Sequence, residues 1–146
     1  MVVLRSVASL PSTGGRRKGD HMPMIQLELW VDRGAAAVTF YRDAFGARVA
    51  HLAGEGEEIV AQLEVDDAIF WVVAVGDSPE RKVPRHINGA TARFLLVVDD
   101  PDRTHARAVA AGAANKSDVQ QEHGWRVGRV VDPFGHEWEI GRPEQA

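Results

Sequence analysis

Two stretches decide the fold of this chain: FYRDAFGA at residues 40–47 and DPFGHEWEI at residues 132–140. The first ends an amphipathic segment with Gly46, and glycine is the usual residue after the last turn of a helix. The second places a Pro-Phe-Gly turn between two strand-like segments. Around these two stretches, the same order of strand, helix and three strands can be read twice.

The first unit begins at Met24, where apolar and polar residues alternate as they do in a half-buried strand. The apolar face is predicted to hold Ile25, Leu27, Leu29 and Val31. The opposite face carries an indole beside polar groups, in the set Gln26, Glu28 and Trp30. Asp32 lies near the predicted start of the helix, and three strands are expected at residues 48–53, 57–65 and 68–76.

The second unit follows a linker at residues 77–90 that is rich in proline and charge. A strand is predicted at 92–98, and Asp100 with Pro101 forms a helix start. This helix is expected to end at Gly112. The remaining strands are predicted at 113–116, 125–131 and 137–141. The fold class is therefore α+β, with two βαβββ modules forming a curved, incomplete barrel that carries its helices on the outer face.

The chain divides into three predicted parts. Residues 1–23 form a flexible N-terminal leader, residues 24–143 a single domain, and residues 144–146 a tail. Within the domain, the modules cover about 24–76 and 91–143.

Composition excludes several classes of function. The chain has no cysteine, which rules out thiolate metal sites and disulfides. Its net charge of -4 argues against nucleic acid as the main partner, because phosphate binding needs a clustered basic face. The basic cluster Arg16-Arg17-Lys18 falls in the leader. No apolar run approaches the roughly 18 residues of a membrane span, so we expect no membrane association and a cytoplasmic location.

With these elements in order, the motifs at 40–47 and 132–138 resemble the vicinal oxygen chelate superfamily, which contains glyoxalase I, bleomycin-resistance proteins, fosfomycin-resistance transferases and extradiol dioxygenases. They are especially similar to its PhnB-like branch. Residues 97–100 (VVDD) and 108–113 (AVAAGA) add two more matches in the family's order. The resemblance covers about residues 24–143. It indicates the scaffold and leaves the reaction open.

The resemblance implies a divalent metal, of the Zn, Ni, Mn or Fe kind, held inside the barrel by His, Gln or Glu. On the first strand the matching position is Gln26 or, with one extra residue before the helix, Ile25. On the last strand it is Glu139. The family's histidine in the second unit corresponds to Arg93, whose guanidinium has no lone pair for a metal. Another expected histidine corresponds to Val60. No metal is therefore favoured, and Arg93 is the expected partner of Glu139.

The six histidines do not restore a metal site. His123 is the one expected to overhang the cavity mouth. The others are predicted elsewhere: His21 in the leader, His51 at a strand edge, His86 in the linker, His105 on the outer helix and His136 as a support of its turn.

Strand parity predicts a ligand-binding wall of indoles and mixed charges on the concave face. Its members are Gln26, Glu28, Trp30, Gln62, Glu64, Trp71, Arg93, Trp125, Arg129 and Glu139. Trp138 has the opposite parity and is assigned to the core under the second helix. Such a wall suits a planar, polar small molecule.

Three functions are compatible with these residues. The first is metal-independent binding or sequestration of a small aromatic or cationic molecule by a homodimer, as in antibiotic resistance. The second is a metal-dependent lyase, isomerase or thioltransferase of the glyoxalase class, using Gln26 and Glu139 with Glu28 or His123 as ligands. The third is a metal-free enzyme in which Glu139 or Glu28 is the base beside Arg93.

Overall fold

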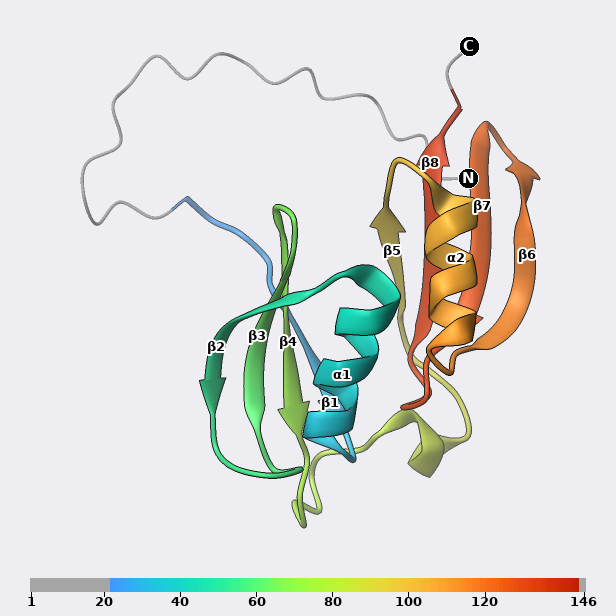
Figure 1. The fold of residues 1–146 in the computed structure, drawn as a ribbon. Coiled ribbons are helices and arrows are strands. Elements are labelled where there is room, and N and C mark those ends of the chain that lie inside the picture. Colours follow the sequence, from blue (N-terminus) through green and yellow to red (C-terminus); the bar gives the residue numbers. More distant parts are fainter. Residues whose placement is uncertain (1–21, 145–146) are drawn as a thin grey trace, which may run out of the picture.

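The computed structural model describes residues 22–144, which fold into two βαβββ units (Figure 1). The predictions for residues 1–21, including Arg16-Arg17-Lys18 and His21, and for 145–146 lie outside the described residues. In chain order the elements are β1 (Leu27–Val31), α1 (Gly34–Phe45), β2 (Arg48–Ala53), β3 (Val60–Val65), β4 (Ala68–Ala74), the short 3-10 helix η1 (Pro84–Ile87), β5 (Arg93–Val97), α2 (Pro101–Ala110), β6 (Ala114–Glu122), β7 (Trp125–Val131) and β8 (Glu137–Pro143).

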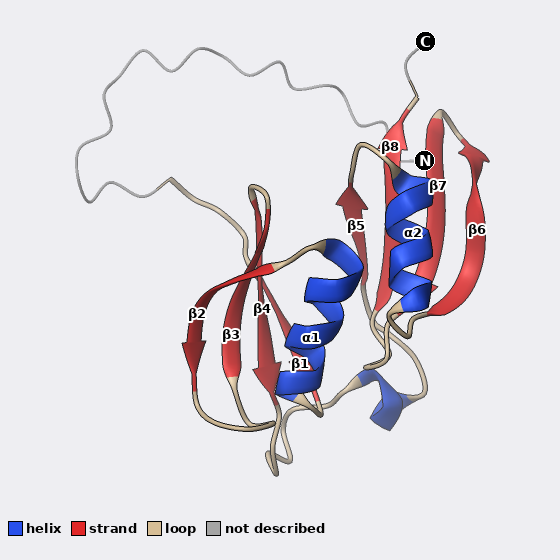
Figure 2. Ribbon diagram, in the orientation of Figure 1, coloured by secondary structure: helices blue, strands red, loops and turns tan. Residues whose placement is uncertain are grey.

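The two units build two four-stranded sheets with the same topology (Figure 2). The first sheet has the order β1-β4-β3-β2 and the second the order β5-β8-β7-β6. In each, the first strand of the unit runs parallel to the last strand, and the other pairs are antiparallel. Among residues 22–144 no strand pair joins the two sheets, so no closed barrel forms. The predicted α+β class with two βαβββ modules is confirmed.

Helix α1 forms where the spacing of apolar residues predicted it. Its buried residues include Phe40, Tyr41 and Phe45, which recur on one side of the helix. Gly46 ends it in the left-handed conformation, with φ at 71°, and its N–H donates to the carbonyl of Arg42. The start of the helix differs from the prediction. Arg33 holds the capping position, but its side chain forms no hydrogen bond to the first turn of the helix, and the carboxylate of Asp32 instead faces Arg33 and Arg85.

Helix α2 begins as predicted at Asp100, whose carboxylate accepts a hydrogen bond from the N–H of Arg103 at 3.1 Å. Pro101 occupies the first turn, where no N–H is needed. The helix ends at Ala110, two residues before the glycine that we expected to terminate it.

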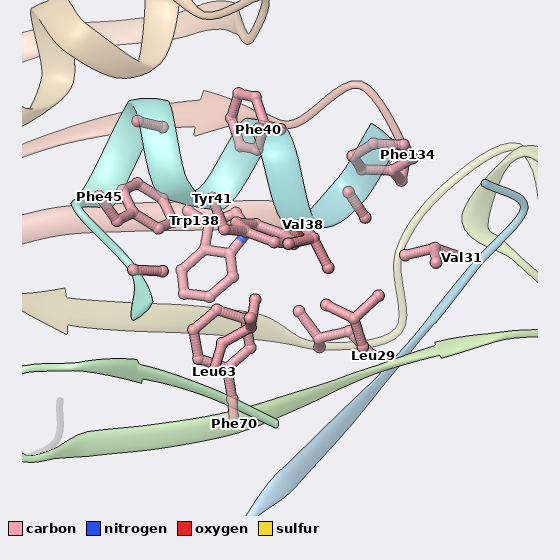
Figure 3. Close-up of a cluster of buried hydrophobic side chains, with 14 of the residues drawn as sticks. Leu29, Val31, Val38, Phe40, Tyr41, Phe45, Leu63, Phe70, Phe134 and Trp138 are labelled. Carbon is pink, nitrogen blue, oxygen red and sulfur yellow. The ribbon is translucent and has the colours of Figure 1, made fainter. Parts of the chain in front are cut away.

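A single aromatic core lies between the two sheets, and α1 is at its centre (Figure 3). Phe70 of β4 and Trp138 of β8 lie 5.6 Å apart between ring centroids, and Tyr41 of α1 contacts both rings. Trp138 is buried as predicted, and its ring contacts Tyr41 and Phe45 of the first helix. The helix-bearing faces of the two sheets therefore face each other. We call the opposite face of each sheet its open face.

The carboxylate of Asp132 ties the DPFGH turn into this core. Its Oδ2 accepts hydrogen bonds from the Tyr41 hydroxyl at 2.5 Å and from Nε1 of Trp138 at 3.0 Å. Its Oδ1 accepts from the backbone N–H groups of Phe134 and His136. Four donors compensate the cost of burying this carboxylate. Burial, together with the negative charge of Asp132, raises the pKa of Tyr41 well above its ordinary value.

Several strand limits differ from the sequence prediction. The strand expected at 113–116 extends over nine residues, as β6, because it pairs with β7 along most of its length through two register shifts. The strand expected from residue 57 begins at Val60, after a turn. Strand β1 begins at Leu27, so that Ile25 is 91% exposed and Leu27 lies partly open instead of belonging to the core.

The linker is more ordered than its composition predicted. Residues 84–87 form η1, and Val83 and Pro84 are buried against the turn that contains Gly135. A Cβ added to Gly135 would lie 2.8 Å from Cβ of Pro84, so only glycine permits this approach. Within residues 22–144, none of the helices has the length and apolar character that a membrane crossing requires.

Candidate functional site

On the open face of the first sheet, Gln26, Gln62 and Trp71 form a hydrogen-bonded cluster. The indole N–H of Trp71 donates to Oε1 of Gln26 at 2.8 Å, and the amide of Gln62 donates to the same oxygen at 3.3 Å. Gln62 and Trp71 are direct partners in the antiparallel β3–β4 ladder, which holds their side chains together. Parity predicted all three residues for one face, and the structure brings them together.

His51, which was predicted at a strand edge, lies on the edge strand β2 and belongs to the same face. Its ring lies 6.0 Å from that of Trp71, and it pairs with Gln62 across β2 and β3. A register shift between Val49 and His51 changes the face of the sheet to which the side chains after it point. Parity alone cannot detect such a shift. Beside this group, Glu64 forms an ion pair with Arg48.

Arg129 is the centre of an ionic network on the open face of the second sheet. Its guanidinium donates two hydrogen bonds to the carboxylate of Glu122, at 3.1 and 3.0 Å, and Nε donates to Glu139 at 3.0 Å. Arg93 approaches the other oxygen of Glu139, with Nε 3.2 Å from Oε1. The Arg93–Glu139 pair is thus present as the sequence predicted, and Glu139 lies between two guanidinium groups.

Glu137 and Lys116 extend this network, and neither was singled out from the sequence. Nζ of Lys116 lies 2.8 Å from Oε1 of Glu137, and the Arg93 guanidinium lies 3.6 Å from the same oxygen. Hydrogen bonding to Lys116 lowers the pKa of Glu137, and the bond from Arg129 lowers that of Glu122. The pKa of Arg129 is raised, mainly by its hydrogen bond to Glu122. Glu137 shares the parity of Glu139, which was the signal available for finding it.

The charges on this face balance. Three cations (Arg93, Lys116 and Arg129) face three carboxylates (Glu122, Glu137 and Glu139). A charged ligand therefore meets groups that are already paired with one another. Its net charge adds little to its affinity for this face.

A cavity of about 190 Å³ opens beside this network. Its apolar wall is made by Leu95, Trp125 and Val127, and its polar wall by Glu122, His123, Arg129 and Glu139. Trp125 and Arg129 thus line one cavity, as predicted. His123 also lines it, from the turn between β6 and β7, where it adopts a positive φ of 51°. This agrees with the prediction that His123 overhangs a cavity.

Glu28 and Trp30 occupy β1, at the edge of the first sheet. Glu28 is opposite Trp71 in the parallel β1–β4 register, and Glu28 and Trp30 both line a cavity other than the one beside Arg129. The structure therefore does not bring all ten predicted site residues together. Among residues 22–144 no hydrogen bond or ion pair joins the Gln26 cluster to the Glu139 network. The contact between Phe70 and Trp138 on the helix-bearing faces explains this separation.

The other histidines within residues 22–144 have structural partners. His105 lies on the second helix, as predicted, and it is buried there, with Nε2 3.1 Å from the carbonyl oxygen of Ser117 on β6. His86 accepts a bond from the N–H of Val83 within the linker. Nε2 of His136 lies 2.8 Å from the carbonyl oxygen of Trp30, so this ring connects the DPFGH turn to β1.

The donor set does not fit the divalent metal that the resemblance implies. Oε1 of Gln26 already accepts from Trp71 and Gln62, and the carboxylate of Glu139 is engaged by Arg93 and Arg129. A metal at Glu139 would also face the positive charge of two guanidinium groups. In the part of the chain that the structure describes, no three His, Asp or Glu side chains are grouped in a way that could hold an ion.

Comparison with known proteins agrees with the fold. The chain is 33% identical over 141 residues to the uncharacterized protein Rv0887c of Mycobacterium tuberculosis, covering 88% of this chain and 82% of that protein. The crystal structure of the Arabidopsis thaliana At5g48480 product superposes with a TM-score of 0.67 at 28% identity, covering 84% of this chain and 100% of that one. TioX from Micromonospora sp. ML1 superposes with a TM-score of 0.65 at 27% identity, covering 86% and 99%. The family profile matches residues 24–140, and the chain belongs to the Glyoxalase/Bleomycin resistance protein/Dioxygenase superfamily.

Proposed function

We propose that this protein binds a small aromatic or cationic molecule without a metal ion. The observation that carries this proposal is the occupation of both family ligand positions by internal partners: Trp71 and Gln62 engage Gln26, and Arg93 and Arg129 engage Glu139. Binding and sequestration need no metal and no catalytic base. The presence of Arg93 in place of the family's metal-ligating histidine therefore does not impair such a function. Sequestration of a toxic compound, as in antibiotic resistance, is the use we propose.

Indole rings supply the binding surface in this proposal. Trp71 and Trp125 are both half-buried on open faces, with ring area left for stacking. Stacking of aromatic rings contributes about 0.5–1.5 kcal/mol beyond simple burial. The balanced charges around Arg129 then orient the polar edge of the ligand.

We also propose that the working unit is a homodimer, because each chain carries two half-sites that face apart. Leu95 and Val97 on β5 are exposed, as is Leu27 on β1. Both strands are sheet edges, which are suited to a neighbouring strand. In a two-fold dimer, the first sheet of one protomer and the second sheet of its partner would form one cleft.

Membership of the PhnB-like branch, indicated by the motifs at 40–47 and 132–138, is also part of the proposal. The cytoplasmic location stays a prediction.

Metal content is the first test. The protein is purified without chelators, and bound Zn, Ni, Mn and Fe are measured by elemental analysis. We expect less than about one tenth of an equivalent, because a functional metal site binds tightly enough to survive purification. One equivalent that is lost in Glu139→Gln would contradict metal independence.

Ligand binding is the second test. Tryptophan fluorescence is followed while neutral and cationic aromatic dyes are added, with aliphatic cations, which cannot stack on the indole rings, as the control. We expect saturable quenching that is weakened in Trp71→Phe and Trp125→Phe. A flat response across the dye panel would argue against a binding function.

A glyoxalase-class lyase, isomerase or thioltransferase is the second candidate. Its support is that His123 and Glu139 line the same cavity of about 190 Å³, so that a base and a second polar group are available together. Turnover of a thiol adduct of a 2-oxoaldehyde that disappears in Glu139→Gln would favour this candidate over binding alone.

A further inference from the structure

A second cavity, of about 420 Å³, lies where the linker crosses the edge of β1. Its wall comes from four separate segments: β1, the linker with η1, the start of β5, and the turn before β8. The side chains that matter for its chemistry are Glu28, Trp30, Lys82, Ile87, Phe94 and His136. Gln26, Trp71, Arg93 and Glu139 do not line it, so it is distinct from the proposed site.

The walls of this cavity are fixed within one chain. Nε2 of His136 lies 2.8 Å from the Trp30 carbonyl oxygen, which holds the turn against β1. The linker is anchored next to it, because Val83 and Pro84 are buried and Gly135 permits Pro84 to approach closely. The cavity is therefore preformed and needs no second copy, a condition that reduces the entropic cost of binding.

Large apolar groups remain uncovered in this cavity although its walls are fixed. Trp30 is 37% exposed and Ile87 is 49% exposed, and Phe94 is half-buried between them and the core. A ligand that removes such apolar surface from water is favoured by its burial. Trp30 and Ile87 both line the cavity, so its wall offers apolar area to a flat group.

Two opposite charges complete the lining. Glu28 and Lys82 both line the cavity, and within residues 22–144 neither forms an ion pair, with the other or with a third residue. Glu28 differs in this respect from Glu64, Glu122, Glu137 and Glu139, which all have cationic partners. The cavity therefore offers one acceptor for a cation and one donor for an anion.

We propose that this cavity binds a small zwitterion with a flat apolar group, of the kind represented by an aromatic α-amino acid. Glu28 receives the ammonium group and Lys82 the carboxylate, while Trp30, Ile87 and Phe94 cover the ring. The volume lies within the range of about 300–1,000 Å³ that is usual for small-molecule sites. The proposal is independent of the function proposed above, because its cavity is formed by one chain and by other side chains.

Three matched probes test the charge requirement in the full chain: L-phenylalanine, 2-phenylethylamine, which lacks the carboxylate, and 3-phenylpropanoate, which lacks the ammonium. Calorimetric titration should give saturable binding of L-phenylalanine and at least about 10-fold weaker binding of each singly charged probe, which corresponds to about 1.4 kcal/mol. Equal binding of all three probes, or no binding of any at millimolar concentration, would overturn the proposal.

Two variants assign the charges. In Glu28→Gln, L-phenylalanine should bind no better than 3-phenylpropanoate binds the unaltered protein, and in Lys82→Met it should bind no better than 2-phenylethylamine does. Glu55→Gln, on the loop after β2, is the matched control and should keep the original affinities. Trp71→Phe distinguishes the two sites, because it weakens dye binding and leaves L-phenylalanine binding unchanged. If L-phenylalanine binding were lost in Trp71→Phe and kept in Glu28→Gln, the zwitterion would occupy the open face and this assignment would be wrong.

Discussion

The rings of Phe70 and Trp138 lie 5.6 Å apart, and through this contact the last strands of the two βαβββ units share one core. Phe70 belongs to β4 and Trp138 to β8, which are the equivalent strands of the two sheets. Each ring also contacts Tyr41 of α1. The position of these three rings determines which faces of the sheets are covered and which stay open for ligands.

Trp138→Ala should be the most destabilising single change that we consider. It removes a buried indole and the hydrogen bond from Nε1 to Asp132. We expect a loss of about 3–5 kcal/mol in the free energy of unfolding, measured by urea denaturation. Trp138→Phe keeps most of the packing and should cost clearly less. Val109→Ala on the exposed side of α2 is the control, and a loss there equal to that of Trp138→Ala would contradict this account of the core.

The hydroxyl of Tyr41 predicts a loss of stability at alkaline pH. Its pKa is raised in the folded protein, so the folded state keeps this proton at a pH where the unfolded chain, with an ordinary pKa of 10.0, releases it. The stability that this group contributes is complete below pH 10 and decreases as the pH rises above it. Because the chain has one tyrosine, tyrosinate absorbance reports this group directly.

We expect tyrosinate to appear together with the loss of the circular dichroism signal, and not before it. Tyr41→Phe should reduce the slope of stability against pH above pH 10. Tyrosinate formation at pH 10 in a chain that is still folded would show that the hydroxyl is not held as described.

The ionic network of the second sheet predicts a loss of stability in acid. The pKa values of Glu122 and Glu137 are lowered below 4.5, so the unfolded chain takes up protons before the folded protein does. The contribution of these groups is complete above about pH 4.5. It is lost as the pH falls through their lowered values. Denaturant titrations between neutral pH and pH 3 should show a smaller decrease in Glu137→Gln than in the unaltered protein.

Glu55→Gln serves as the control for this acid series and should follow the unaltered protein. An unchanged slope in Glu137→Gln would mean that Lys116 and Arg93 do not stabilise the carboxylate in solution.

Gly128 on β7 should not tolerate a side chain. A Cβ at this position would lie 2.7 Å from Cγ2 of Val119 and 2.9 Å from Cδ2 of His105, between β6 and α2. Gly128→Ala should therefore lower the free energy of unfolding by about 1–3 kcal/mol in urea denaturation. Gly89→Ala is the matched control, because nothing lies within 4 Å of its added Cβ. An equal loss in the free energy of unfolding in Gly128→Ala and Gly89→Ala would argue against the close approach at Gly128.

Strand parity predicted much of the candidate site from the sequence because side chains alternate strictly in an uninterrupted ladder. It placed Gln62 and Trp71 on one face and paired Arg93 with Glu139. It was not applied to His51, which was predicted at a strand edge and lies on the edge strand β2, and the register shift beside this residue has no signature in the sequence. It also overextended the apolar face of β1, since Ile25 precedes the first residue that pairs with β4.

Other features could not be predicted because they depend on contacts between distant segments. The contact of Trp138 in the second unit with Phe45 in the first is decided by how the units dock, and alternation within β8 does not contain this information. The cavity beside Trp30 depends in the same way on the path of the linker. Proline and charge in that segment predicted exposure, but the contact between Pro84 and Gly135 fixes it against the turn.

The shared aromatic core also means that neither repeat is self-sufficient. Separating the chain within the linker would leave Phe70 on one fragment and Trp138 on the other, each exposed to water. Two such fragments would regain their structure only by associating with each other. Each unit is thus stable only when it is packed against the other. Substitutions on either open face can accumulate without disrupting the aromatic core that the two units share.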